Sequence, residues 1–320
     1  MPAPTPARFA GALPPRAGLD VYKAHGLGND YLVVERGNAW SLDGSAVRRV
    51  CHRTLGAGSD GIIWVDPDTS PFALRMFNPD GSEFERSGNG LRILASYLHR
   101  TGRVGGEAFR VTVGGEEVEM QVLEARSGRY DVVAAMGTAR VGPAAVGLEP
   151  AAVSEGPRPG EVRLPLREEE LIVVPVSVGN PHAVVWGAPE AWPWRALDDA
   201  DAVADLERIG PGVTSHPAFA EGTNVQLARV VSPTRIQALV WERGAGRTSA
   251  SGTSACAVAV SAVVSGRVPA GEIEVAMEGG VLRVGVTEAL DVRLRGPVEA
   301  VMTGRLEPGL VAPRDGNREG

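Results

Sequence analysis

One stretch of this chain occurs twice with the same spacing. The first copy is FNPDGSEFERSGNGLRILASYLHRTGRV (77–104), and the second is WERGAGRTSASGTSACAVAVSAVVSGRV (241–268). Each copy begins with an aromatic and a polar residue, and nine residues after the polar one comes a Ser-Gly pair, Ser87-Gly88 or Ser251-Gly252. Both copies then run through a helix-like segment to a Gly-Arg-Val ending. Such matched spacing indicates two duplicated halves, each with a serine at the start of a helix.

The two expected helix starts are suited to binding an anion. The first N–H groups of a helix have no partner within the helix, and the helix dipole is positive at that end. A capping serine would explain either copy alone. Capping, however, requires neither a glycine beside the serine nor an identical preceding segment, so the duplication favours a ligand site at Ser87 and Ser251.

The two helices differ in their hydrophobic pattern. The first carries one apolar stripe, formed by Leu91, Leu94 and Leu98, and Arg92 is expected to lie on the surface. The second, Ala255 to Val264, is apolar on nearly all sides and is expected to be buried.

Composition limits the class of protein. A chain of 320 residues is long enough for two domains, and its net charge of -7 without a basic cluster argues against a nucleic-acid or anionic-membrane surface. Residues 1–18 are rich in proline and alanine, lack an apolar core, and predict a flexible tail rather than a secretory signal. Two cysteines, Cys51 and Cys256, do not form a disulfide framework. A cytoplasmic enzyme or small-molecule-binding protein is expected.

Alternating apolar residues predict strands before and after each copy of the repeat. A strand, a glycine-asparagine turn and another strand surround Gly28-Asn29 and recur around Gly179-Asn180. The predicted organisation is α+β, with an N-terminal half at 19–138, a C-terminal half at 139–296, a final strand at 297–308 that returns to the N-terminal half, and a tail at 309–320. Residues 141–170, rich in proline, glycine and glutamate, are expected to form a crossover rather than packed elements.

The polar residues left at strand ends and in turns suit a zwitterionic ligand. Glu242-Arg243 offers one charge of each sign, and five asparagines offer neutral donors and acceptors: Asn29, Asn78, Asn89, Asn180 and Asn224. The histidines lack metal-ligand spacing, and no phosphate-binding loop follows a strand. An amino acid is therefore the expected ligand, with no metal.

Five segments together resemble the motifs of the diaminopimelate epimerase family: HGLGNDY, FNPDGSEFERSGNGLR, VGNPH, EGTNV and ERGAGRTSASGTSACA. They occur in the family's order and cover residues 20 to 308. The resemblance implies a cofactor-independent epimerase of lysine biosynthesis with two pseudo-symmetric domains, each a β-sheet or barrel around a central helix, and substrate in the cleft between them. In the family, one cysteine removes the substrate α-proton and a second donates a proton to the opposite face.

This chain departs from the family at both proton-transfer positions. Ser87 and Ser251 stand where the family has its two cysteines. A helix N-terminus can bring a thiol into the working pKa range, whereas a serine hydroxyl needs another residue to deprotonate it. Cys51 and Cys256 are expected to be core residues rather than substitutes. Glu85 is the nearest acidic residue in sequence, although a solvated charge is the simpler interpretation.

The remaining family positions carry over residue by residue. The resemblance places Glu242 and Arg243 at the distal amino acid end of the substrate. His25 and His182 are implied to be supports, and Arg247 stands where many members have glutamate. The implied substrate-binding residues are Asn29, Asn78, Gly88, Asn89, Asn180, Asn224, Glu242, Arg243, Gly252 and Thr253, of which Gly88, Asn89, Gly252 and Thr253 supply backbone donors to the α-carboxylate.

Three interpretations fit two serines in an otherwise complete site. The chain is an epimerase whose cysteines were replaced and whose activity is impaired or altered, a divergent amino-acid isomerase or dehydratase, or a non-catalytic amino-acid-binding protein. A small-molecule substrate and a homodimer are expected, without nucleic acid or membrane partners. The residues alone do not separate the three interpretations.

Overall fold

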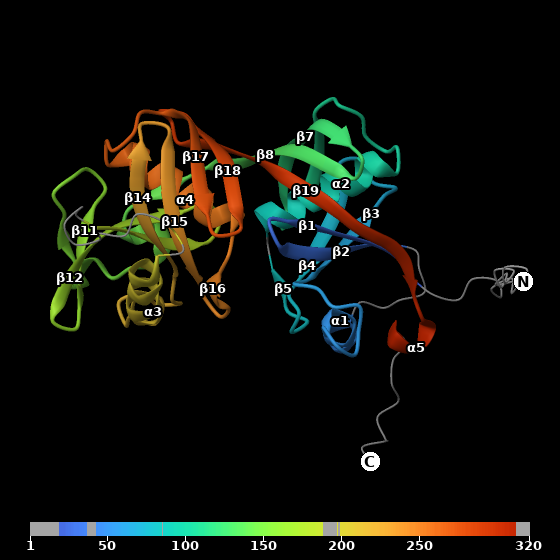
Figure 1. The fold of residues 1–320 in the computed structure, drawn as a ribbon, viewed down its shortest axis with the longest axis horizontal. Helices are drawn as coiled ribbons and strands as arrows, with labels where there is room; N and C mark the ends of the chain where they lie inside the picture. Colours follow the sequence, from blue (N-terminus) through green and yellow to red (C-terminus); the bar gives the residue numbers. More distant parts are fainter. Residues whose placement is uncertain (1–18, 37–42, 85, 188–196, 198, 312–320) are drawn as a thin grey trace, which may run out of the picture.

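The chain folds into two lobes joined by two long strand segments (Figure 1). The computed structural model describes residues 19–36, 43–84, 86–187, 197 and 199–311, so the tail at 1–18, Glu85 and most of the tail at 309–320 lie outside the described residues. No helix in these ranges is long and apolar enough to cross a membrane.

The N-terminal lobe is a closed barrel around one helix. Its pairing order is β1-β2-β3-β4-β6-β7-β8-β19, and β19 pairs with β1 to complete the circle. The pairs β2–β3 and β4–β6 are parallel, and the others are antiparallel. The elements are β1 (Leu19–Gly26), β2 (Asn29–Glu35), α1 (Gly44–Cys51), β3 (Ile62–Asp66), β4 (Phe72–Phe77), β5 (Glu83–Phe84), α2 (Gly88–Arg100), β6 (Phe109–Val113), β7 (Glu116–Arg126) and β8 (Arg129–Thr138).

The C-terminal lobe repeats this arrangement around a second helix. The parallel pairs β13–β14 and β15–β17 correspond to β2–β3 and β4–β6. Its elements are β9 (Arg140–Val141), η1 (Pro143–Val146), η2 (Pro150–Ala152), β10 (Ser154–Glu155), β11 (Val162–Leu166), β12 (Glu169–Ser177), β13 (Pro181–Trp186), α3 (Ala200–Thr214), β14 (Asn224–Ser232), β15 (Arg235–Glu242), β16 (Gly246–Thr248), α4 (Gly252–Val264), β17 (Gly271–Met277), β18 (Gly280–Val286) and the start of β19 (Asp291–Leu306). The last helix, α5 (Pro308–Val311), returns to the N-terminal lobe and packs beside α1 (Figure 1). The expected α+β fold of two barrels, each around a central helix, is confirmed.

The strand β19 belongs to both lobes. It pairs with β18 near its start and with β1 near its end, and β8 lies along its other side. Alternating apolar residues predict two separate strands here, at 291–294 and 299–303. The strand continues instead, because residues 296–298 pair only with β8 and the missing N–H of Pro297 faces no second neighbour.

The expectation of an unpacked crossover at 141–170 is wrong. This segment contains β9, β10, β11 and two 3-10 turns, and Leu148 and Leu164 are buried there. Val162, Leu164 and Leu166 alternate in β11, a strand signal that the proline and glycine around it obscured. These apolar residues form one packed cluster with α3 on the outside of the C-terminal barrel.

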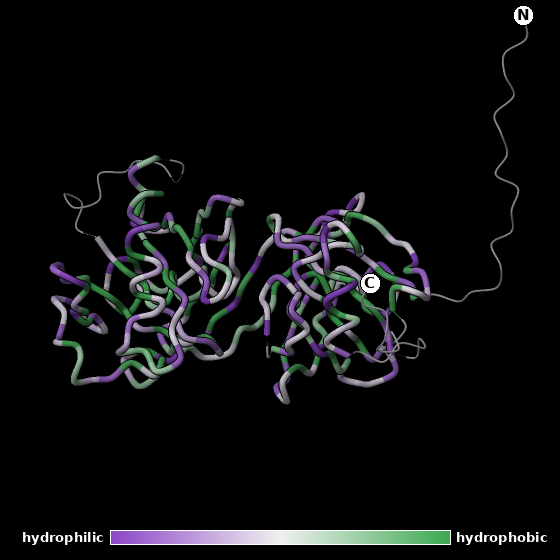
Figure 2. The backbone as a smooth tube through the Cα atoms, turned by 90° about the horizontal axis from the view of Figure 1, so that it is seen from below, coloured by the Kyte–Doolittle hydropathy of each residue, from purple (hydrophilic) through white to green (hydrophobic). Residues whose placement is uncertain are grey.

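The helices α2 and α4 form the centre of the largest hydrophobic cluster. Leu91, Leu94 and Leu98 are fully buried, as the stripe predicts, and every residue of α4 from Gly252 to Ala262 is buried. Both lobes carry apolar segments in their interiors when viewed from below (Figure 2). Because the two barrels enclose α2 and α4, the positions of the helix N-termini are set by the cores around them.

Candidate active site

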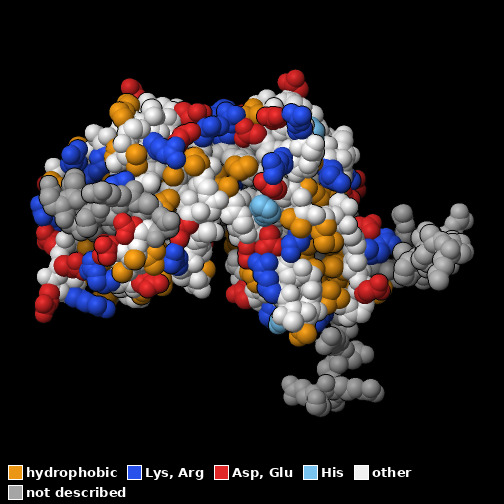
Figure 3. Space-filling model, in the orientation of Figure 1, with side chains coloured by type: hydrophobic (Ala, Val, Ile, Leu, Met, Phe, Trp, Pro, Cys, Tyr) orange, Lys and Arg blue, Asp and Glu red, His pale blue; other side chains and the backbone are white. Residues whose placement is uncertain are grey.

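The N-termini of α2 and α4 meet at the junction of the two lobes. A Cβ atom on Gly88 would lie 3.4 Å from the Gly252 Cα atom, and one on Gly252 would lie 3.2 Å from the Gly88 Cα atom. Leu294 of β19 packs against the same pair. Figure 3 shows the surface deeply notched between the two lobes. Two positive helix ends therefore face one small region, as expected for an anion site.

The contact between the two glycines predicts a steric effect. In Gly252→Ala the new methyl group would lie 2.9 Å from Leu294 Cδ2 and against backbone on the other side, so the helix ends must separate. We expect a loss of about 1–3 kcal/mol in the free energy of unfolding, together with weaker ligand binding. Gly105→Ala is the matched control, because a Cβ there meets nothing within 4 Å. Equal stability of the two variants in urea unfolding would contradict this packing.

Ser87 is held by two donors. It is the N-cap of α2, and its Oγ accepts a hydrogen bond from the Gly90 N–H at 3.1 Å. The Tyr31 hydroxyl donates to the same oxygen at 3.4 Å. Burial raises the pKa of Tyr31, so Tyr31 stays protonated at neutral pH. With its oxygen accepting from both sides, Ser87 keeps its own proton free for another acceptor.

Ser251 has different surroundings although it occupies the equivalent position. It is the N-cap of α4, yet its side chain makes no capping hydrogen bond. The Glu242 carboxyl at the end of β15 is its partner. Burial raises the pKa of Glu242, its interaction with the Ser251 hydroxyl opposes this rise, and the charge of Asp60 adds to it. A carboxylate accepts but does not donate, so Glu242 can receive the Ser251 proton.

Asn29 and Asn89 are joined across the N-terminal lobe. The Asn89 Nδ2 atom donates to Asn29 Oδ1, and Asn29 Nδ2 donates to Asp60 Oδ2, both at 3.0 Å. Asp60 is fixed in turn by Arg53, whose Nη2 lies 2.6 Å from Asp60 Oδ1 and 2.7 Å from Asp30 Oδ1. Both asparagine amides are thereby held in one orientation beside the α2 N-terminus.

Asn180 is fixed by a buried histidine. His182 Nε2 lies 2.8 Å from Asn180 Oδ1, and Gln226 Nε2 lies 3.0 Å from His182 Nδ1 and 3.0 Å from the Ser254 hydroxyl. Burial lowers the pKa of His182 to about 3, so the ring is neutral at physiological pH. Because Gln226 donates to Nδ1, the ring proton is on Nε2 and points to Asn180. His182 thus supports Asn180. His25 accepts a hydrogen bond from the Gly28 N–H at 3.3 Å in the adjacent turn.

The other sequence-predicted residues serve the surrounding turns. Asn78 Nδ2 donates to Ser82 Oγ at 3.0 Å. The buried Asn224 donates to the Pro181 carbonyl at 3.0 Å and accepts from the Arg243 N–H at 2.9 Å, which ties three strands together. Arg243 is exposed and its Nη1 donates to the Glu221 carbonyl. Gly252 and Thr253 form the buried first turn of α4. Ligand contacts by these residues stay a prediction.

Sequence reasoning missed four residues around the site. Tyr31 is the last residue of the segment HGLGNDY, and Asp60 lies in a glycine-rich segment, GAGSDG, at 56–61. Arg86 donates to the carbonyls of Met136 and Val178, each at 3.1 Å, where the lobes join. The expectation that Arg92 lies on the surface is wrong, because its side chain is fully buried. The Arg92 side chain donates a hydrogen bond to Asn89 Oδ1. Because Arg92 follows Asn89 by three residues, about one helical turn, the sequence could have indicated this hydrogen bond.

The two cysteines take no part in the site. Cys51 and Cys256 are both buried, and burial raises the pKa of Cys256 to about 12. Within the described ranges, no group of three or more histidine, cysteine, aspartate or glutamate side chains is arranged to hold a metal ion.

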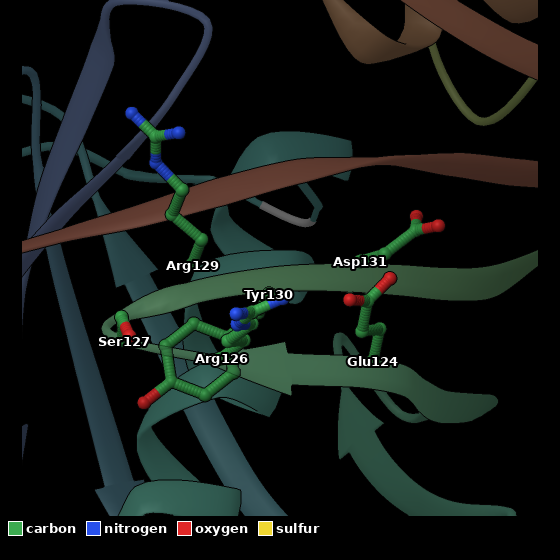
Figure 4. A pocket seen from close by; sticks show the side chains of 6 residues that line it. All are labelled: Glu124, Arg126, Ser127, Arg129, Tyr130 and Asp131. Atoms are coloured by element: carbon green, nitrogen blue, oxygen red, sulfur yellow. The ribbon is translucent and has the colours of Figure 1, made fainter.

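An open concavity of about 650 Å³ lies elsewhere, on the β7–β8 hairpin (Figure 4). Asp131 at its edge is paired with Arg295 at 2.6 Å. Its lining residues are Glu124, Arg126, Ser127, Arg129, Tyr130 and Asp131. It includes neither Ser87 nor Ser251, nor any other residue of the α2 and α4 N-termini.

Comparison with known proteins identifies both a family and a fold. The family model for diaminopimelate epimerase matches residues 21–141 and 174–306. Diaminopimelate epimerases from Desulforudis audaxviator and Pelotomaculum thermopropionicum are 39% and 37% identical, over 90% and 88% of this chain and 99% and 96% of their own lengths. A hydroxyproline epimerase structure from Agrobacterium vitis, with bound trans-4-hydroxy-L-proline, superposes with a TM-score of 0.66 at 14% identity, covering 90% of this chain and 92% of that chain. That likeness shows the fold alone.

Proposed function

The chain belongs to the diaminopimelate epimerase family, and we propose that it interconverts LL- and meso-diaminopimelate by proton transfer at Cα between Ser251 and Ser87, at a rate limited by its two hydroxyl groups. The proposal is supported by relatives of that name that match nearly its full length. We propose that the protein acts in lysine biosynthesis and in the cytoplasm. The reaction uses the chain's own side chains for proton transfer, with no metal or cofactor.

The different partners of the two serines carry the mechanism. Ser251 gives its proton to Glu242 and removes the substrate α-proton, since a hydroxyl is a useful base only when another group takes its proton. Ser87 retains its proton, because the Gly90 N–H and the Tyr31 hydroxyl occupy its oxygen, and it protonates the opposite face of Cα. Each forward turnover leaves Glu242 with one proton more and Ser87 with one proton fewer, which is the state from which the reverse reaction starts. A proton must return from Glu242 to Ser87 through solvent before the next turnover in the same direction.

The paired helix N-termini supply the electrostatic part of the reaction. Loss of the α-proton places negative charge on the substrate carboxylate, and the N–H groups that follow Gly88 and Gly252 are already aimed at that region. Donors that are fixed before the reaction stabilise developing charge without reorganisation, commonly by several kcal/mol. Asn180, Asn78 and Arg243 remain as candidates to hold the distal amino acid end.

Deuterium incorporation at Cα from D₂O, measured by mass spectrometry, tests this function. We expect LL-diaminopimelate to exchange faster with the protein than without it. The double variant Ser87→Ala/Ser251→Ala should be inactive, since it retains the binding groups without either hydroxyl. Exchange only with a different amino acid would favour a divergent isomerase. Diaminopimelate binding without exchange would favour a non-catalytic amino-acid-binding protein.

A further inference from the structure

We propose that Arg92 is a positioning residue of the active site, whose buried positive charge raises the affinity of the paired α2 and α4 N-termini for a carboxylate. The inference rests on the proposed function only for the identity of the ligand. It concerns a side chain on the second turn of α2 that faces the interior of the protein.

Arg92 is a buried cation without an ionic partner. Its side chain is the largest among the fully buried ones, and no carboxylate in the described part of the chain lies within ion-pair distance of its guanidinium. Its Nε atom has no hydrogen-bond partner there either. Burial lowers the pKa of Arg92 to about 10, so the group is still charged at neutral pH. An uncompensated buried charge costs several kcal/mol, which indicates a function beyond stability.

The surroundings of Arg92 provide space for this charge. A Cβ atom on Gly26 of β1 would lie 3.0 Å from Arg92 Nη2, and one on Gly296 of β19 would lie 3.3 Å from Arg92 Nε. Neither glycine has a positive φ angle, so the backbone conformation does not require glycine at either position. Gly26 is explained by the guanidinium, and Gly296 by the guanidinium together with Leu282.

The hydrogen bonds of Arg92 lead directly to the anion site. Its Nη1 atom donates to the carbonyl of Gly88 at 3.1 Å, and its Nη2 atom donates to Asn89 Oδ1 at 2.5 Å. Asn89 then donates to Asn29, and Asn29 to Asp60. Every donor in this series points away from the Arg92 guanidinium and toward the Asp60 carboxylate, so each hydrogen bond polarises the next. These hydrogen bonds fix the first turn of α2, whose N–H groups face the lobe junction.

Two ionisable groups besides the site lie near Arg92. Cys256 on α4 and Asp131 on β8 interact with it electrostatically. Burial raises the pKa of Cys256 to about 12, so it is a neutral thiol at physiological pH, and Asp131 is already paired with Arg295. The charge of Arg92 is therefore left to act on the helix N-termini rather than being neutralised beside it.

The pKa of a thiol introduced by Ser87→Cys measures this charge without a substrate. Thiolate absorbance is followed with pH in Ser87→Cys alone and combined with Arg92→Met or Arg92→Lys. Burial keeps the pKa values of Cys51 and Cys256 above the ordinary thiol value, so the new thiol titrates first. We expect Arg92→Met to raise the pKa of the new thiol by about one unit and Arg92→Lys to restore most of the shift. Arg100→Met, at the far end of α2, is the matched control and should have no effect.

An unchanged thiol pKa in Arg92→Met would overturn the proposal, because a purely structural arginine would affect only the melting temperature. If Arg92→Met fails to fold, Arg92→Gln, which keeps a donor without the charge, decides in the same way. A second measurement uses titration calorimetry with meso-diaminopimelate, for which we expect about tenfold weaker binding in Arg92→Met. If the unmodified protein binds no diaminopimelate, the proposed function fails, and the thiol pKa still decides the role of Arg92.

Discussion

Replacing both serines by cysteine, Ser87→Cys/Ser251→Cys, is expected to raise the rate of Cα proton exchange in diaminopimelate by about 10²–10⁴-fold. A cysteine thiol has an ordinary pKa of about 8.5, and a helix N-terminus lowers this pKa further. A serine hydroxyl, in contrast, is almost never ionised near neutral pH. Both positions already lie at helix N-termini, and the only chemical change is the replacement of each hydroxyl oxygen by sulfur. The measurement is the initial rate of deuterium incorporation from D₂O.

The single variants separate the two positions. Either Ser87→Cys or Ser251→Cys alone should gain less than the pair, since one face of Cα would still depend on a hydroxyl. The reference is the unmodified protein at equal substrate saturation, so that differences in binding do not enter the ratio. If the double variant binds diaminopimelate and exchanges no faster than the unmodified protein, the lobe junction is not the proton-transfer site.

Replacing Glu242 by glutamine is expected to reduce kcat for exchange by about 10²-fold or more in the unmodified protein. Its carboxyl is the partner of Ser251 and the group that can take the hydroxyl proton. The pH profile provides the sharper test. Glu242 must be deprotonated to act, and its pKa is raised by burial, so exchange should increase with pH above the ordinary titration range of glutamate. This rise should disappear in Glu242→Gln.

Glu278→Gln is the matched control for Glu242→Gln. Glu278 also lies in the C-terminal lobe, where its carboxylate is paired with the guanidinium of Arg247 rather than with a serine. Its replacement removes the same charge and should leave both the rate and the pH profile unchanged. Equal losses in the two variants would indicate a general effect of charge on binding. A pH profile that is retained in Glu242→Gln would assign the proton from Ser251 to another acceptor.

The repeat itself predicted much of the architecture. Matched spacing around Ser87 and Ser251, and the repeated turns at Asn29 and Asn180, indicated two halves with one central helix each, and both barrels follow that pattern. Such features depend on local spacing and hydrophobic period, which a sequence displays directly. The resemblance to an epimerase family was likewise visible in short motifs whose order is preserved.

The contacts between distant segments were decided only by the tertiary structure. Glu242 stands nine residues before Ser251 and appeared suited to the distal end of a substrate, yet β15 and α4 bring its carboxyl to the serine hydroxyl. Arg92 appeared to be a surface residue because arginine usually is, and its burial depends on space left by glycines in β1 and β19. Local spacing sets which elements form, whereas the closing of two barrels on shared strands sets which side chains meet.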